Sequence, residues 1–167
     1  MAATTLFLGG ARSGKSRLAQ AAAEVLPGPL VHIATATAGD AEMAERIARH
    51  QSDRGPRWRT VEIPVALADA IADAAPAIVL VDCLTLWLSN LMLGESDIDA
   101  ATATLLAAIR VAQHPLFLVS NEIGLGIVPD TPLGRAFRDA AGRLNQQVAA
   151  AVDRVEFVAA GLSMRLK

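Results

Sequence analysis

A glycine-rich segment early in the chain has the residue types and spacing that bind a triphosphate. It has the form Gly-x4-Gly-Lys-Ser and consists of Gly9, Gly10, Ala11, Arg12, Ser13, Gly14, Lys15 and Ser16. Glycines let backbone N–H groups wrap a phosphate, and the following helix directs its positive dipole end at it. Lys15 then bridges the outer phosphates, and Ser16 supplies a hydroxyl to Mg²⁺. The segment predicts a P-loop, and the alternative is a plain glycine turn between a strand and a helix.

The choice of lysine inside this segment supports the P-loop prediction. Of the fifteen basic residues, only Lys15 and Lys167 are lysines. A compact ammonium fits between phosphates where a planar guanidinium does not. A chain that otherwise uses arginine therefore has a chemical reason for lysine at position 15.

Asp82 is the second candidate group. It ends an apolar run at residues 77–81, so it is expected at the carboxyl edge of a buried strand, beside the phosphate site. A carboxylate there holds the Mg²⁺ shell or orients an attacking hydroxyl. The alternative is an aspartate that only caps the next helix.

His50 is the candidate nucleophile. The region around it is rich in arginine, with Arg46, Arg49, Arg54, Arg57 and Arg59. In an acidic protein such a cluster suggests bound phosphate. A neutral imidazole can attack phosphorus once nearby cations neutralise the triphosphate. By spacing, His50 also shares a helical face with Met43 and Ile47, so a histidine packed against the core is the alternative.

Short apolar runs that alternate with helical patterns must position these groups. The runs predict strands at residues 4–8, 30–34, 58–63, 77–81, 115–119, 155–159 and 162–166. The helical patterns cover about residues 16–25, 40–51, 66–74, 85–93, 97–112 and 131–153. We therefore predict an α/β fold in which residues 1–167 form a single RecA-like P-loop domain. It has a mostly parallel sheet of six or seven strands, helices on both faces and a C-terminal hairpin.

Composition narrows the class of protein. A chain of 167 residues, 53% of them apolar, is long enough for one continuous core. Its net charge of -2 argues against a nucleic-acid partner. No apolar stretch approaches the roughly 20 residues that cross a bilayer, no signal-peptide pattern precedes the first strand, and Cys83 has no disulfide partner in the chain. A cytoplasmic protein without membrane insertion is expected, with His32 and His114 in structural roles.

Taken together, these motifs resemble the bifunctional adenosylcobinamide kinase/adenosylcobinamide-phosphate guanylyltransferases of cobalamin biosynthesis. The resemblance runs almost from end to end. It rests on residues 8–17, 33–35, 42–50, 58–62, 82–85, 90–91, 120–124, 126–129, 137–139 and 142–146. The P-loop alone would not identify the family, but this set in this order does.

The resemblance implies two reactions and a set of catalytic residues. ATP or GTP phosphorylates the aminopropanol hydroxyl of adenosylcobinamide, and GMP then passes from GTP to that phosphate, giving adenosylcobinamide-GDP and pyrophosphate. A histidine at the position of His50 carries GMP as a covalent phosphoramidate. Lys15 and Asp82 are the other implied catalytic residues, Ser16 and Asp82 the Mg²⁺ ligands, and a homotrimer the implied assembly.

The resemblance also implies where the guanine nucleotide binds. The contacts fall on the P-loop residues 9–16, on Ala34, Thr35 and Ala36, on Gln51, Ser52, Asp53 and Arg54, on Glu62 and on Asp82. Glu62 is expected to recognise guanine by accepting hydrogen bonds from its N1–H and exocyclic amine, which adenine cannot reproduce. The chain departs from the family at Gln51, where arginine is usual, and at Gly55, which separates Arg54 from the proline that usually follows it.

Two other functions also fit the residues. A plain small-molecule P-loop kinase would use Lys15, Ser16 and Asp82 without His50. An NTP-driven RecA-like motor or interaction module would share the fold. Glu122, which follows the strand at 115–119, is a candidate to orient the cobinamide hydroxyl, and the alternative is a residue that caps the loop before Gly124.

Overall fold

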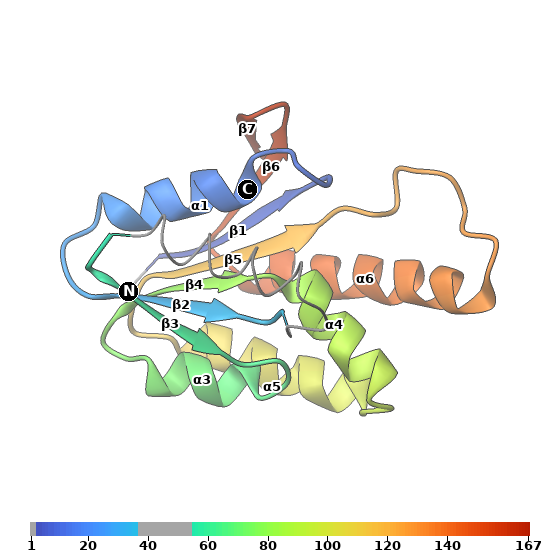
Figure 1. Cartoon of the computed structure of the whole chain (residues 1–167), viewed down its shortest axis with the longest axis horizontal. Coiled ribbons are helices and arrows are strands. Elements are labelled where there is room, and N and C mark those ends of the chain that lie inside the picture. Colours follow the sequence, from blue (N-terminus) through green and yellow to red (C-terminus); the bar gives the residue numbers. More distant parts are fainter. Residues whose placement is uncertain (1–2, 37–54) are drawn as a thin grey trace.

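One seven-stranded sheet forms the centre of the protein. The computed structural model describes residues 3–36 and 55–167, and its strand order is β3-β2-β4-β5-β1-β6-β7 (Figure 1). The strands are β1 (Thr4–Gly9), β2 (Leu30–Ala34), β3 (Trp58–Glu62), β4 (Ile78–Asp82), β5 (Leu116–Asn121), β6 (Arg154–Ala159) and β7 (Leu162–Arg165). The described helices are α1 (Lys15–Glu24), α3 (Leu67–Asp73), α4 (Leu84–Leu93), α5 (Ile98–Val111) and α6 (Pro132–Ala151).

The sheet confirms the predicted fold class. Strands β1 to β6 pair in parallel, and β7 pairs antiparallel with β6 as a terminal hairpin. The described elements begin and end within two residues of the predicted ranges. The predicted helix at residues 40–51 lies outside the described residues.

Helices cover both faces of the sheet, as predicted. Helix α1 lies on one face, and α3, α4, α5 and α6 lie on the other (Figure 1). Successive residues of a strand point to opposite faces, so Leu6 joins the core beneath α3–α6, and Phe7 joins the core beneath α1. The central strands are mostly apolar because both of their faces are buried.

The two described histidines are buried, as structural roles require. His32 is 5% exposed within β2, and His114 is 4% exposed just before β5. Burial lowers the pKa of His114, which favours the neutral imidazole. Within the described ranges, no helix combines the length and apolar character needed to cross a membrane.

Candidate functional site

Parallel strands bring the predicted site residues to one edge of the sheet. In β2, Ala34 lies level with Glu62 of β3 and with Asp82 of β4. In β1, Gly9 lies level with Asn121 of β5. All of these positions are at carboxyl ends of strands, where α/β sheets bind ligands. The sheet thus lines up the P-loop, Asp82 and Glu62 along one edge, and their roles in binding stay predictions.

The first and last glycines of the P-loop are required by their surroundings. A Cβ on Gly9 would lie 2.3 Å from the carbonyl oxygen of Val158 in β6. Gly14 has a φ of +97°, and a Cβ there would lie 3.2 Å from the Cα of Gly161 in the β6–β7 turn. Larger residues at either position would push the loop away from the hairpin.

The β6–β7 turn also holds the P-loop through hydrogen bonds. The N–H of Gly161 donates to the carbonyl of Ser13 over 2.8 Å. The guanidinium of Arg17 donates to the carbonyl of Gly161 over 3.4 Å. The P-loop, which is the predicted phosphate-binding cradle, is therefore braced by a part of the chain almost 150 residues away in sequence.

Helix α1 begins inside the P-loop with its N-terminus suited to an anion. Gly14 is its N-cap, and Lys15 is its first residue. The first turn of this fully described helix contains no acidic residue. Its N–H groups and positive dipole end are therefore not neutralised by the protein's own side chains, which favours a phosphate there.

Lys15 is a buried cation on the inner side of this loop. It is 7% exposed, and its Nζ donates to the carbonyl of Gly10 over 2.9 Å. Burial lowers the pKa of Lys15, and the nearby Cys83 and Asp82 act in the opposite direction. The ammonium has lost most of its water, so an incoming polyphosphate would supply the missing negative charge.

Asp82 ends β4 and does not cap the helix that follows. The N-cap of α4 is Cys83, and this helix has no side-chain N-cap hydrogen bond. The capping alternative for Asp82 is therefore wrong. Cys83 is buried, and burial raises the pKa of its thiol. The half-buried Asp82 carboxylate remains available at the sheet edge.

Thr35 holds the chain directly after this carboxylate. It is fully buried, and its hydroxyl donates to the carbonyl of Cys83 over 2.7 Å and accepts from the Cys83 N–H over 2.9 Å. Its own N–H donates to the Asp82 carbonyl over 3.3 Å. Its carbonyl accepts from the Asn90 side chain over 2.8 Å. All polar groups of Thr35 are thus engaged within the protein, which gives it a positioning role that the sequence did not reveal.

Asn90, in α4, adds two hydrogen bonds around the Asp82 segment, and we call these contacts of Thr35 and Asn90 the Asn90 bracket. Its amide also donates to the carbonyl of Pro64 over 3.0 Å, so one side chain ties the end of β2 to the segment after β3. Only Thr85, Ser89 and Asn90 are polar in α4. A polar side chain in an apolar helix was the signal that could have identified Asn90.

Replacing Asn90 with leucine should destabilise the protein and slow turnover. Two partly buried carbonyls would lose their donor, which costs about 1–3 kcal/mol of unfolding free energy. The segment after Asp82 would also lose its support. Urea unfolding and steady-state kinetics measure both effects. The matched control is Gln113→Leu, because Gln113 also donates an amide to a carbonyl, but on an exposed site. If both variants behave alike, the Asn90 bracket has no special role.

A second set of buried polar groups holds the end of β5. The N–H of Asn121 donates to the Thr85 hydroxyl over 2.7 Å, and its carbonyl accepts from Asn145 over 3.1 Å. The next residue, Glu122, donates its N–H to the carbonyl of Gly9 over 2.9 Å. The Glu122 carboxylate accepts from the N–H of Gly124. The structure thus contains the loop-capping contact, and a catalytic role for Glu122 stays a prediction.

Arg57 does not belong to a phosphate-binding cluster. Its guanidinium donates to the carbonyls of Glu24, Leu26 and Gly28 in the turn between α1 and β2. It immediately precedes β3 and therefore lies at the amino edge of the sheet, opposite the P-loop. The prediction that grouped Arg57 with the other arginines is wrong, because the strand direction carries it away from the site.

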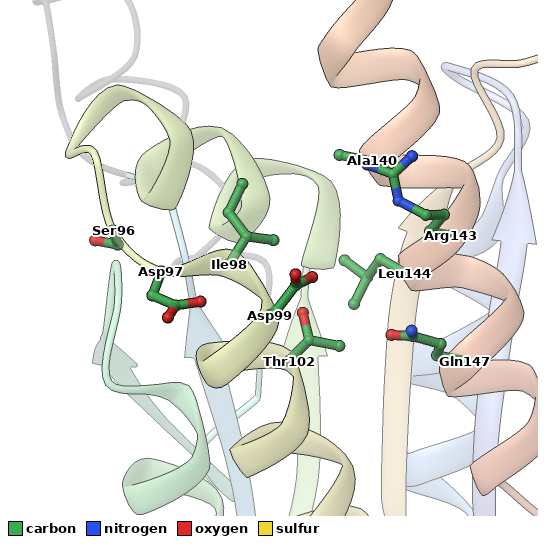
Figure 2. Close-up of a pocket in the computed structure, with 9 residues that line it drawn as sticks. All are labelled: Ser96, Asp97, Ile98, Asp99, Thr102, Ala140, Arg143, Leu144 and Gln147. Carbon is green, nitrogen blue, oxygen red and sulfur yellow. The ribbon is translucent and has the colours of Figure 1, made fainter.

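His50 and the contacts predicted next to it, Gln51, Ser52, Asp53 and Arg54, lie outside the described residues. A hollow that the structure does describe lies elsewhere, between α5 and α6 (Figure 2). Its volume is about 250 Å³, and its polar lining includes Asp97, Asp99 and Arg143. None of the predicted site residues lines it.

Comparison with known proteins gives close relatives along nearly the whole chain. The family model for cobinamide kinase / cobinamide phosphate guanyltransferase matches residues 5–166. The bifunctional adenosylcobalamin biosynthesis protein CobP of Pseudomonas aeruginosa is 48% identical over 166 residues, covering 97% of this chain and 96% of that protein. The bifunctional adenosylcobalamin biosynthesis protein CobU of Salmonella typhimurium is 41% identical over 179 residues, covering 97% and 98%.

A solved structure shares the fold at much lower identity. A protein from Pyrococcus horikoshii superimposes with a TM-score of 0.58 and 8% identity, covering 99% of this chain and 86% of that one. At that identity the likeness concerns the fold alone.

Proposed function

The chain belongs to the cobinamide kinase / cobinamide phosphate guanyltransferase family, and from this premise we propose how its residues divide the two reactions. It is a bifunctional kinase and guanylyltransferase of cobalamin biosynthesis. The observation that carries the division of roles is the alignment of the P-loop, Asp82 and Glu62 along one sheet edge. In this proposal the same sheet edge binds the triphosphate, the metal ion and the guanine base.

The P-loop binds the triphosphate in both reactions. Backbone N–H groups of residues 9–16 surround the phosphates at the N-terminus of α1, and the Lys15 ammonium binds the outer ones. The burial of Lys15 supports this role, because within the described residues its ammonium donates a hydrogen bond to the carbonyl of Gly10, over 2.9 Å, and to no carboxylate. The kinase step transfers the γ-phosphoryl group to the cobinamide hydroxyl and leaves a nucleoside diphosphate.

Ser16 and Asp82 would hold Mg²⁺. Both supply oxygen donors, which Mg²⁺ prefers, and substrate phosphates and water complete its shell. Among the described residues no group of three or more histidine, cysteine or acidic side chains could hold a metal ion without such help. This fits Mg²⁺ bound with its nucleotide. When bound, the ion neutralises phosphate charge.

His50 is the proposed nucleophile of the guanylyl transfer. An imidazole nitrogen forms a bond to the α-phosphorus of GTP, and the bond from that phosphorus to the bridging oxygen breaks, releasing pyrophosphate. An oxygen of cobinamide phosphate then attacks the same phosphorus, and the imidazole leaves. The neighbouring arginines in the sequence support this role by offsetting the negative charge of the nucleotide.

Glu62 is the proposed guanine-reading group. Its side chain is exposed at the end of β3, level with Ala34. Ala34, Thr35 and Ala36 would contact the nucleotide mainly by shape, since the polar groups of Thr35 are already engaged. Gln51, Ser52, Asp53 and Arg54 keep their proposed contacts from the resemblance. The same resemblance supports a cytoplasmic homotrimer, with ATP or GTP as phosphoryl donor.

Labelled GTP tests the proposed division. Protein incubated with α-labelled GTP alone should retain about one label per site, acid-labile and alkali-stable as phosphohistidine is. With γ-labelled GTP and adenosylcobinamide, the label should appear in cobinamide phosphate. Chelation of Mg²⁺ should stop both transfers. Phosphorylated cobinamide without any α-label on the protein would contradict the covalent step and leave a plain kinase.

A further inference from the structure

An uncharged loop protrudes beside the phosphate cradle. Residues 123–129, between β5 and α6, contain no charged side chain. Leu125 is 82% exposed, Ile127 95% and Val128 54%. Exposed apolar side chains that gather in one short segment commonly mark a binding surface. We call this segment the apolar loop.

The apolar loop is fixed at both ends. At its start, the Glu122 N–H donates to Gly9 of the P-loop over 2.9 Å, and the Glu122 carboxylate accepts from Gly124. At its end, Arg135 donates to the carbonyls of Pro129 over 3.0 Å and Asp130 over 2.8 Å. The exposed side chains are therefore carried on an anchored segment.

The anchor places the apolar loop next to the reacting phosphates. The apolar loop follows β5, and β5 lies between β1, which leads into the P-loop, and β4, which ends at Asp82. Figure 1 shows it extending beyond the carboxyl edge of the sheet before it reaches α6. A molecule that contacts the apolar loop can therefore also reach the cradle.

We propose that the apolar loop binds the corrin ring of cobinamide, with Leu125, Ile127 and Val128 in contact with the macrocycle. This inference rests on the proposed function. The acceptor's hydroxyl must reach the cradle while its bulky macrocycle stays outside, so an apolar surface beside the cradle suits it. The polar cradle and the apolar loop match the two ends of this substrate.

Other places and other occupants fit less well. The hollow between α5 and α6 has about 250 Å³ and two acidic residues in its lining, which is below the roughly 300–1,000 Å³ that drug-sized ligands occupy. A second copy of the chain would need about 800 Å² on each partner. Three side chains on one short loop supply far less than that, so the apolar loop cannot form a subunit interface by itself.

The test compares two double variants in the kinase reaction. Leu125→Ser/Ile127→Ser should raise the KM for adenosylcobinamide at least about tenfold at saturating GTP, because apolar contacts with the ring are lost. The KM for GTP should stay unchanged. Labelling by α-labelled GTP without cobinamide should also stay unchanged, since that step does not involve the acceptor. Surface substitutions of this kind rarely unfold a protein, and urea unfolding checks this.

The matched control replaces two exposed valines at the ends of α1 and α5. Val25 is 81% exposed and Val111 68%, so Val25→Ser/Val111→Ser should leave both KM values unchanged. An unchanged KM for adenosylcobinamide in the loop variant overturns the inference. So does an equal rise in both KM values with loss of label, because the loop would then shape the cradle. A fall in molar mass by light scattering would assign the loop to a subunit contact. If the wild type itself phosphorylates no cobinamide, the proposed function fails, whatever the loop variant does.

Discussion

Lys15→Ala should abolish both reactions and leave the protein folded. Both reactions need the same cradle, and the loss of a desolvated cation that faces the phosphates should lower turnover by at least about 10²–10³-fold. The fold should survive because burial lowers the pKa of Lys15, which means that its charge is a cost to the empty native state. Kinase and labelling assays measure the first effect, and thermal unfolding measures the second.

The other lysine is the natural control. Lys167 donates to the carbonyls of Ala149, Ala150 and Val152 at the end of α6. Lys167→Ala should therefore lose about 0.3–1 kcal/mol of stability through the helix terminus and keep both activities. Wild-type turnover in Lys15→Ala would mean that Lys15 does not bind the phosphates.

His50→Asn should separate the two reactions. Transfer of the γ-phosphoryl group needs the cradle, Mg²⁺ and the cobinamide hydroxyl, whereas attack on the α-phosphorus needs a nucleophile that asparagine lacks. We expect near-normal formation of cobinamide phosphate, no label from α-labelled GTP and at least about a thousandfold loss of guanylyl transfer.

Two results would contradict this role for His50. Full labelling of the variant by α-labelled GTP would mean that another residue is the nucleophile. Loss of both activities in a folded variant would mean that His50 serves the shared cradle. The kinase assay on the same sample separates these cases from a general loss of structure.

The sheet could be predicted because its signals are local. Buried parallel strands are continuous apolar runs, so β2 and β4 stand out in the sequence. A residue that ends such a run must lie at the carboxyl edge. That is why Asp82 could be assigned to this edge without knowledge of the strand order, whereas Glu62 was named only through the family resemblance.

The hydrogen bonds that hold the site in place could not be predicted, because the residues that they join are distant in sequence. Thr35 and Asn90 are 55 positions apart, and Gly161 and Arg17 are 144 apart. Such contacts depend on strand order and helix placement. Arg57 shows the converse error: it is close to Arg59 in sequence, but its guanidinium braces the opposite edge of the sheet. Closeness in sequence suggested that Arg57 lies at the site, but the direction of β3 places it at the other edge of the sheet.

The brace between the P-loop and the β6–β7 turn orders events during synthesis. The ribosome makes residues 9–16 well before their partners Val158 and Gly161, which follow almost 150 residues later. Until then the loop lacks the strand and the turn that shape it, so a growing chain should not hold nucleotide tightly. Nucleotide stabilises only states that bind it, and it therefore favours chains that have completed the hairpin over those that have not.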